Sequence, residues 1–360
     1  MATFFQRVRR AIVTELSPPQ APTAAPPAPA SPVETTAQPA AHIPLDVASV
    51  RVVAPWALVA PAGRPDPAAV ARVADAVRRA RDDATPVQVH LHLDGAEAPG
   101  DWALRETAEH YAATVGALAR ELGQRGAAPD VWLTLVRPWA SIVEGPPAPP
   151  YALTSAHVAR AHHAVLGHGL AALALRAADP AARVGIVLDQ VVHVPTDDER
   201  SADLHAVHDA DTRRNHLLLG PVLEGALPVD LVAELRGEVD FSPVRPGDLG
   251  RARARIDVLG VAVPRVWRLA GAAQGVDAAE VTGPAERATA LRDLLRAFDV
   301  AHEGLPLLVD AAGTAEQCPE HLPAHLLGDV VRGARADEIP VLPVARAVVR
   351  VGRAPTDGAP

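Results

Sequence analysis

Hydrophobic and polar positions alternate along the chain between short β-rich runs and longer helical segments from residue 50 onward. Runs that are apolar on both faces predict buried strands at 50–55, 87–93, 131–136, 184–192, 256–263, 305–309 and 341–349. Helical periodicity predicts helices between them, at 67–82, 104–122, 156–178, 201–219 and 284–303. Seven strand and helix units favour a TIM-type (β/α)8 barrel. An open doubly wound sheet is the alternative, but no Gly-rich phosphate loop follows the first strand.

The N-terminal segment differs from the rest of the chain. Residues 1–16 place apolar side chains at near-helical spacing, at Phe4, Phe5, Val8, Ile12 and Leu16. Three arginines lie largely on the remaining face, which predicts a short basic amphipathic helix. Docking to a protein partner is the favoured role, with a tail of no specific role or membrane-surface contact as alternatives. Residues 17–42, rich in Pro and Ala, predict a disordered linker before a barrel at 43–352 and a tail at 353–360.

Composition limits the function classes. Half of the 360 residues are apolar, which is enough for one barrel-sized domain. The net charge of -9 gives no reason to expect nucleic acid as a partner. The single cysteine, Cys318, cannot form an internal disulfide, so we expect a cytoplasmic protein, and no apolar run is long enough to span a bilayer. Every basic residue apart from histidine is Arg, a bias of GC-rich coding that agrees with a bacterial origin. No cofactor is expected.

Eight segments carry a resemblance to a known family. In chain order they are VRVVAPW, VQVHLHLD, PGDWALRETAEHYA, VWLTLVRPW, AHHAVLGHGLAALALRA, NHLLLGPVLEGALP, GDLGRARARIDVLGVAVPR and LPLLVDAAG. Their order and content resemble those of family 1 glycoside hydrolases, the β-glucosidase type, over some 300 residues. The family's first barrel strand has no clear counterpart. We therefore expect a barrel that is incomplete at its first strand, and residues 42–47 are the predicted cover of that edge.

The resemblance implies a retaining mechanism with two carboxyl groups about 5 to 5.5 Å apart. At the acid position V-R-P replaces N-E-P, so the side chain is that of Arg137. Because an Arg pKa exceeds about 12, this group cannot donate a proton near neutral pH. At the nucleophile position D-A-A-G replaces T-E-N-G, and the aligned residue is Ala311. The resemblance therefore predicts a chain that lacks both catalytic glutamates.

Six polar residues near the predicted strand ends are candidates for binding a sugar or an anion: Arg51, His92, Asp94, Arg137, Asp189 and Asp310. In the family the counterpart of Arg51 lies beneath the nucleophile, so here Asp310 or Asp94 is its expected counter-ion. Asp189 is the expected counter-ion of Arg137. His92 is either a partner for a sugar hydroxyl or, as we favour, an imidazole satisfied inside the polar mouth.

The remaining histidines and acids carry weaker signals. His90 and His92 alternate on one strand, and three more histidines crowd the predicted helix at 156–178, namely His162, His163 and His168. No carboxylate or third ligand accompanies them at a set spacing, so no metal site is predicted. The acidic run 197–199 is interpreted as a solvated turn.

Two classes of function follow. The first is a non-catalytic, β-glucosidase-like barrel that serves as a binding or assembly module, with residues 1–16 attached to a partner. The second is an enzyme with a rewired mouth, in which Asp94, Asp189, Asp310 or Glu144 serves other chemistry and two arginines favour a phosphate or carboxylate ligand. Residual hydrolysis of β-glycosides, as the family implies, is a further alternative.

Overall fold

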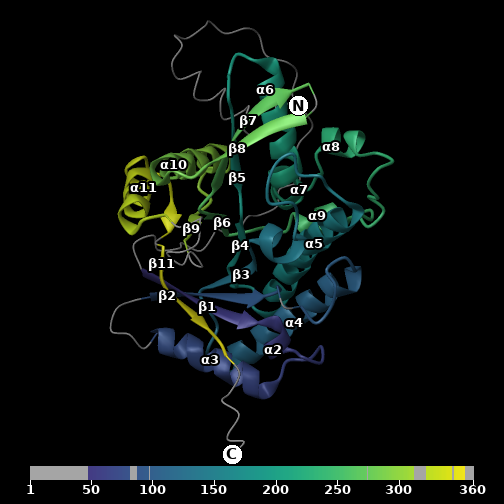
Figure 1. Ribbon diagram of the computed structural model, residues 1–360. Helices are drawn as coiled ribbons and strands as arrows, with labels where there is room; N and C mark the ends of the chain where they lie inside the picture. The colour runs from purple at the N-terminus through teal and green to yellow at the C-terminus, as the bar shows by residue number, and fades with distance from the viewer. Residues whose placement is uncertain are drawn as a thin grey trace, which may run out of the picture.

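The computed structural model describes residues 48–81, 87–96, 98–273, 275–311, 322–342 and 344–352. The helix predicted at 1–16, the linker at 17–42 and the tail at 353–360 lie outside these ranges. Figure 1 shows the main sheet in the lower half of the molecule, with helices on its outer side and a smaller sheet projecting above it.

Eight parallel strands form one curled sheet in the order β10-β9-β6-β4-β3-β2-β1-β11. Their bounds are β1 Ala48–Pro55, β2 Val87–Asp94, β3 Val131–Val136, β4 Val184–Leu188, β6 Val258–Ala262, β9 Leu307–Asp310, β10 Val341–Leu342 and β11 Ala345–Arg350. From β1 to β10 each strand of this sheet lies beside the one before it, and helices connect most of them, which is the arrangement of a TIM-type barrel. The predicted fold class is confirmed.

The edge of β1 is covered by the C-terminal strand. β11 pairs in parallel with β1 from Ser49↔Ala345 to Val53↔Arg350, while β10 pairs with β9 at the opposite edge of the sheet. Only two residues separate β10 from β11. The chain therefore crosses directly from one edge strand of the sheet to the other. Because β2 takes the second side of β1, both of its edges are occupied. Residues 42–47, the predicted cover of this edge, lie outside the described ranges.

The interior of the sheet has an apolar half and a polar half. Strand side chains point alternately to the two faces of a sheet. On β3, β4, β6, β9 and β10 the inward residues form a separate buried cluster of Val131, Leu133, Val187, Val258, Leu308 and Leu342. On β1 and β2 the same face carries five buried polar groups, namely Ser49, Arg51, Gln88, His90 and His92. The outward residues of all these strands, such as Val52 and Leu91, join the larger core beneath the helices.

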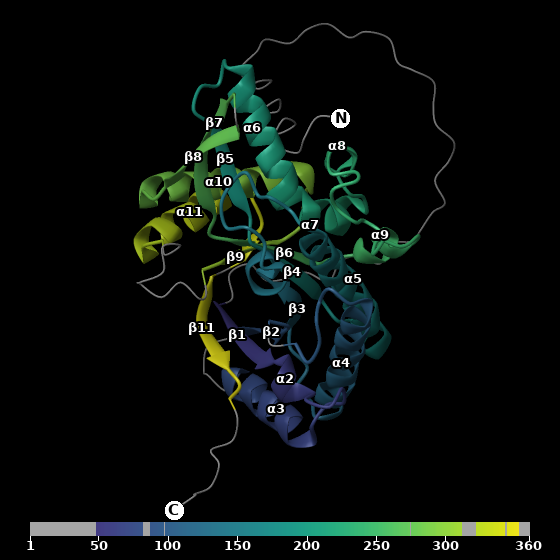
Figure 2. The same cartoon turned by 45° about the vertical axis from the view of Figure 1, so that its right-hand side comes forward.

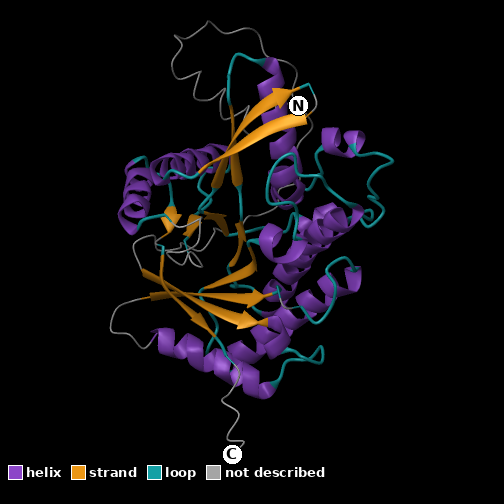
Figure 3. Cartoon of the chain, viewed as in Figure 1, coloured by secondary structure: helices purple, strands orange, loops and turns teal. Residues whose placement is uncertain are grey.

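Helices cover the outer face of the curled sheet (Figures 1 and 3). Their bounds are α2 Trp56–Val59, α3 Pro67–Arg81, α4 Arg105–Gln124, α5 Ser155–Ala178, α7 Leu217–Leu219, α8 Val229–Glu234, α9 Asp248–Ala252, α10 Pro284–Ala301 and α11 Ala324–Ala336. Short π-helical turns are η1 Trp139–Val143, η2 Thr212–His216 and η3 Gly220–Glu224. None of the helices within the described ranges is both long and apolar enough to cross a membrane.

A second sheet was not predicted from the sequence. Its strands are β5 Val191–Pro195, β7 Arg265–Ala272 and β8 Gly275–Val281, in that order, and α6 (Ser201–Asp211) packs against β5 and β7. Figure 2 shows this sheet projecting from the barrel with α6 beside it. The predicted strand 184–192 is thus divided between two sheets, because the chain leaves the barrel at Asp189 and Gln190.

Candidate active site

Three charged side chains meet in the interior of the barrel. The Nη1 atom of Arg51 on β1 lies 2.8 Å from Oδ1 of Asp310 on β9. The Nε atom of Arg137, which follows β3, lies 3.3 Å from Oδ2 of the same carboxylate. Since β4 and β6 separate β3 from β9 in the sheet, these contacts cross the barrel instead of joining adjacent strands. The Asp310 side chain is 1% exposed, so two cations surround an almost fully buried carboxylate.

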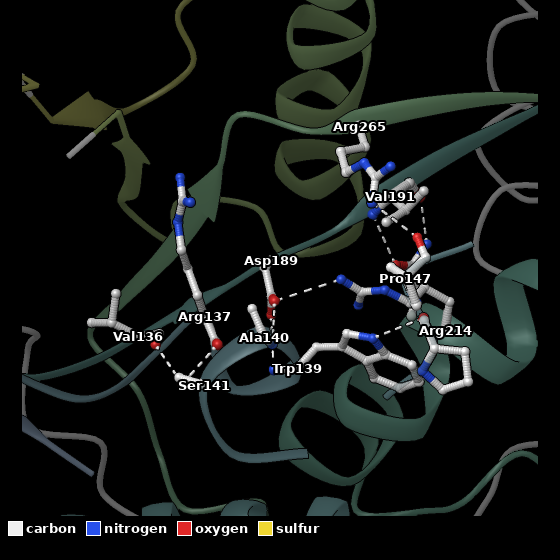
Figure 4. A network of polar contacts seen from close by, with 12 residues as sticks. Val136, Arg137, Trp139, Ala140, Ser141, Pro147, Asp189, Val191, Arg214 and Arg265 are labelled. Carbon is white, nitrogen blue, oxygen red and sulfur yellow. Dashed lines mark hydrogen bonds and ion pairs between the residues drawn. The ribbon is translucent and has the colours of Figure 1, made fainter. Parts of the chain in front are cut away.

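The backbone at the end of β3 sets the position of Arg137. The pairing of β3 with β4 shifts between Leu133 and Val136, where β3 holds one extra residue. Arg137 then adopts a left-handed conformation, with φ of 53°, and its N–H donates to the carbonyl of Val187 at 2.9 Å. Its own carbonyl accepts a hydrogen bond from the hydroxyl of Ser141 at 2.9 Å (Figure 4). A strained residue held by hydrogen bonds on both sides places its side chain in one direction.

Asp189 has other partners than the sequence suggested. Its carboxylate accepts hydrogen bonds from the backbone N–H groups of Trp139 (3.1 Å) and Ala140 (2.9 Å), at the start of η1. The guanidinium of Arg214 on η2 lies 3.5 Å away and also stacks 4.4 Å above the Trp139 ring. In Figure 4 Arg214 points toward Asp189, whereas Arg137 points away from it. The predicted pairing of Asp189 with Arg137 is therefore wrong.

The pKa of Asp189 follows from these surroundings. Burial raises the pKa, while Arg214 and the two N–H groups of η1 act in the opposite direction. The result is a carboxyl group that titrates above its ordinary value. Its hydrogen bonds anchor the start of η1 to the end of β4, which supports a structural role for the group.

Asp94 lies at the end of β2 and is separate from Arg51. Its Oδ2 atom lies 3.3 Å from Nη2 of Arg350 on β11, and its Oδ1 atom accepts a hydrogen bond from the N–H of Ala96 at 3.0 Å. Of the two expected counter-ions of Arg51, the structure therefore selects Asp310. Arg350 was not among the predicted site residues, because local periodicity does not predict the pairing of β11 with β1.

His92 and His90 stand in the polar half of the interior. Burial lowers the pKa of each to about 4, and nearby charges, among them Arg51, modify it. Both imidazoles are therefore neutral at pH 7. His90 lies 3.4 Å from Oε1 of Gln88, and His92 makes no hydrogen bond to any residue in the described ranges. The favoured interpretation of His92, an imidazole whose hydrogen bonds are satisfied inside the mouth, therefore has no support among the described residues.

The position aligned with the nucleophile holds a side chain that points out of the barrel. Ala311 packs against the large core beneath the helices. Its neighbour Asp310 lies on the inner face, with Leu308 two residues before it in the apolar interior cluster. The carboxylate beside Arg51 therefore belongs to the residue that precedes the aligned position. In the sequence this carboxylate was a candidate counter-ion of Arg51 and a candidate ligand-binding or rewired site residue.

A buried network next to the mouth was missed in the sequence. The Tyr151 hydroxyl lies 3.0 Å from Nε2 of His193, and Asp211 lies 3.9 Å from Nδ1 of His193 and 3.1 Å from Nε2 of His216. Asn215 donates to Asp211 at 2.6 Å and to the carbonyl of β5 residue Val191 at 2.7 Å. Burial alone would raise the pKa of Asp211, but its proximity to the two histidines holds the pKa well below its usual range.

The helix histidines make structural contacts. His162 lies 3.1 Å from Oδ2 of Asp248, and Arg105 contacts the same carboxylate at 2.7 Å. His168 lies 2.6 Å from the hydroxyl of Thr134 on β3. The part of the chain that the structure describes holds no group of three or more His, Cys, Asp and Glu side chains suited to a metal ion. His162 and His168 therefore serve to hold α5 against α9 and against the barrel.

The chemistry open to the mouth is limited by its cations. The group that faces Asp310 across the barrel is the guanidinium of Arg137, which stays protonated at all pH values of interest. Asp189 is bonded to backbone N–H groups and Arg214, and Asp94 to Arg350. All three carboxylates therefore already form ion pairs with arginines or accept hydrogen bonds from backbone N–H groups.

Comparison with known sequences agrees with this architecture. The sequence model of glycosyl hydrolase family 1 matches residues 45–280, which is more than half of the chain. The thermostable beta-glucosidase B of Thermobispora bispora is 30% identical over 251 residues, covering 64% of this chain and 50% of that protein. A bifunctional beta-D-glucosidase/beta-D-fucosidase of Bifidobacterium breve is 33% identical over 177 residues, covering 47% and 35%. The chain thus matches half or less of the length of these relatives.

Solved structures share the fold. A β-glucosidase from Exiguobacterium marinum superposes with a TM-score of 0.68 and 19% identity, covering 84% of this chain and 75% of that one. The psychrophilic β-glucosidase BglU from Micrococcus antarcticus gives a TM-score of 0.62 and 23% identity, covering 85% and 74%. Both likenesses extend past residue 280, the end of the matched family segment, because they cover most of the chain. On its matched sequence and on its barrel, this chain belongs to glycosyl hydrolase family 1.

Proposed function

We propose that this chain is a non-catalytic member of its family, a barrel that serves as a binding or assembly module. The observation that carries the proposal is the contact of Arg137 with Asp310. A retaining glycosidase needs an acid that protonates the departing oxygen, and here the aligned position holds a permanent cation. That cation lies 3.3 Å from the carboxylate that would have to act as nucleophile.

Electrostatics support the same conclusion. A carboxylate that accepts charge-assisted hydrogen bonds from two guanidinium groups is a weak nucleophile, because attack would require it to give up both contacts. Loss of a single catalytic carboxylate removes most of the rate in enzymes of this type, and residues of one catalytic unit act non-additively. The neutral imidazole of His92 offers no replacement, since with a pKa of about 4 it is deprotonated at pH 7 and cannot serve as the acid.

The direct test is an assay of the purified full chain with aryl β-glucosides and β-galactosides. The expected rate equals that of buffer. Two variants distinguish true activity from contamination by a host enzyme: Asp310→Asn, which alters the mouth, and Asp337→Asn, which alters an exposed pair with Arg296. Turnover that survives Asp337→Asn and disappears with Asp310→Asn would refute the proposal.

A second candidate function is binding of an anionic ligand at the mouth, with or without chemistry. Three guanidinium groups, Arg51, Arg137 and Arg214, gather there with two carboxylates, Asp310 and Asp189, and guanidinium groups bind phosphate and carboxylate ligands well. Thermal unfolding with inorganic phosphate or citrate tests this. A rise in melting temperature that Arg137→Met abolishes and Arg296→Met preserves would support it, and no rise in any variant would count against it.

The cellular setting is also a proposal. The full sequence contains one cysteine, Cys318, so it cannot close an internal disulfide. This supports a reducing compartment such as the cytoplasm. Fractionation of the native host, followed by detection of the chain with an antibody, checks the assignment.

A further inference from the structure

The second sheet has one covered face and one partly open face. α6 packs against β5 and β7 on the side of His193, Trp267 and Val276, as the contacts of its residues Ala206 and Asp211 show. Because strand side chains alternate, the opposite face carries Val192, Val194, Val266 and Val281. Three of these four valines are only partly buried. A three-stranded sheet with a partly exposed row of valines presents an apolar surface, and surfaces of this kind mark sites where another segment or molecule binds.

This open face forms the floor of a groove. The N-terminal part of α10 forms the wall with Ala285, Thr289, Ala290 and Leu294, and the volume of the groove is about 440 Å³. That size lies within the range of about 300–1,000 Å³ found for ligand pockets. The groove is made by the second sheet and α10, so its residues are distinct from those of the barrel mouth.

The charges around the groove are unequal. Glu286 and Asp293 of α10 line it together with Arg268 of β7, and all three are exposed. No hydrogen bond or ion pair joins Arg268 or Asp293 to another residue within the described ranges. The two acids and one base give the rim a formal charge of -1, and the acids lie on one wall. The groove therefore fits an apolar segment that carries more positive than negative charge.

We propose that residues 1–16 of the same chain dock in this groove through their apolar side. The segment carries Phe4, Val8 and Ile12 at helical spacing, three arginines and one acid, Glu15. Its formal charge of +2 is opposite to that of the rim. A helix of 16 residues is about 24 Å long, close to the length of about 27 Å expected for the 18 residues of α10. The arginines would face Glu286 and Asp293, and Glu15 would be the partner available to Arg268.

The intervening chain is long enough for this contact. Residues 17–47 are 31 residues, which in an extended Pro-rich conformation span about 95 Å. A folded domain of about 300 residues has a radius of gyration near 19 Å and a diameter of roughly 50 Å. A tether of this kind gives an effective concentration on the order of millimolar, so even a weak contact would be occupied. The docking is independent of whether the mouth is catalytic.

Disulfide trapping in the intact chain tests the proposal. In a Cys318→Ser background one cysteine replaces Thr289 in the groove, and a second replaces Phe4, Val8 or Ile12 in turn. The matched control places the first cysteine at Leu173 on α5, which is 53% exposed and lies outside the groove. We expect an intramolecular disulfide with at least one of the three partners of Thr289→Cys and none with Leu173→Cys.

Two disruptive changes complete the experiment. Val194→Asp in the groove should lower the yield of the disulfide about tenfold, since a charge replaces a partly buried valine that the docked segment would cover. Val8→Asp should do the same from the other side, and it leaves the groove itself unchanged. A disulfide that links two chains would overturn the proposal in favour of a second copy as the occupant. Equal yields at Thr289 and Leu173, or no product at any position, would overturn it altogether.

Discussion

The guanidinium of Arg51 lies 2.8 Å from the carboxylate of Asp310, and the two side chains are 4% and 1% exposed. They join β1 to β9 through the interior of the barrel, and Arg137 adds the end of β3 to the same carboxylate. A single acid thus connects three strands that are not neighbours in the sheet. In a buried site the loss of that acid leaves two guanidinium groups without their shared partner.

Asp310→Asn should therefore destabilise the fold strongly. Removing one partner of a buried ion pair typically costs about 3–5 kcal/mol, because the remaining charge is left desolvated. Urea unfolding at pH 7 measures the change. The matched control, Asp337→Asn, affects an exposed pair with Arg296 and should change the free energy of unfolding by less than about 1 kcal/mol. Equal effects of the two changes would contradict the structural role of Asp310.

A methyl group at Gly169 should loosen the contact between α5 and α9. A Cβ there would overlap the carbonyl oxygen of Arg251 and lie 2.9 Å from Cα of Ala252. We expect Gly169→Ala to lower the free energy of unfolding by about 1–3 kcal/mol. Gly123, near the end of α4, has no atom within 4 Å of the same position, so Gly123→Ala should raise it by up to about 1 kcal/mol. Chemical denaturation of both variants checks the pair, and a loss of stability in both would show that crowding is not the cause.

Stability should fall as the solution becomes acidic, in part through His168. Burial lowers the pKa of this imidazole to about 4, from 6.5 in the unfolded chain. The unfolded state therefore binds the extra proton between about pH 6.5 and pH 4, so the contribution is complete above pH 6.5 and lost as pH falls through that window. The wild-type protein should lose about 2 kcal/mol more than His168→Gln between pH 7 and pH 4.5. Equal losses by urea unfolding would show that His168 does not titrate in this way.

The end of α11 offers a stabilising change at Glu338. This residue has φ of 64°, its N–H donates to the carbonyl of Arg335, and the N–H of Ile339 donates to the carbonyl of Ala334. These two bonds form a Schellman motif, in which glycine avoids the strain of the left-handed conformation. Glu338→Gly should raise the free energy of unfolding by about 1 kcal/mol. Glu338→Ala retains the strain and should be close to neutral, so a gain with alanine of the same size would argue against this explanation.

Much of the scaffold could be predicted from the sequence because it depends on local periodicity. The strands at 87–93 and 131–136 and the helices at 67–82 and 156–178 lie within a few residues of β2, β3, α3 and α5. Residues 265–281 were missed because their hydrophobic pattern is weak. Four of the seven residues of β8 are exposed, so the segment does not resemble a buried strand.

By itself the sequence determined the barrel, the family resemblance and the presence of Arg at the acid position, since each depends on residue identity and order alone. Only the tertiary structure decided that Asp310 pairs with Arg51 and Arg137, that Asp189 pairs with Arg214, and that β11 covers the edge of β1. The physical reason is that a counter-ion is chosen by distance in space. Distance depends on strand register, on one extra residue in β3 and on side-chain length, none of which local periodicity specifies.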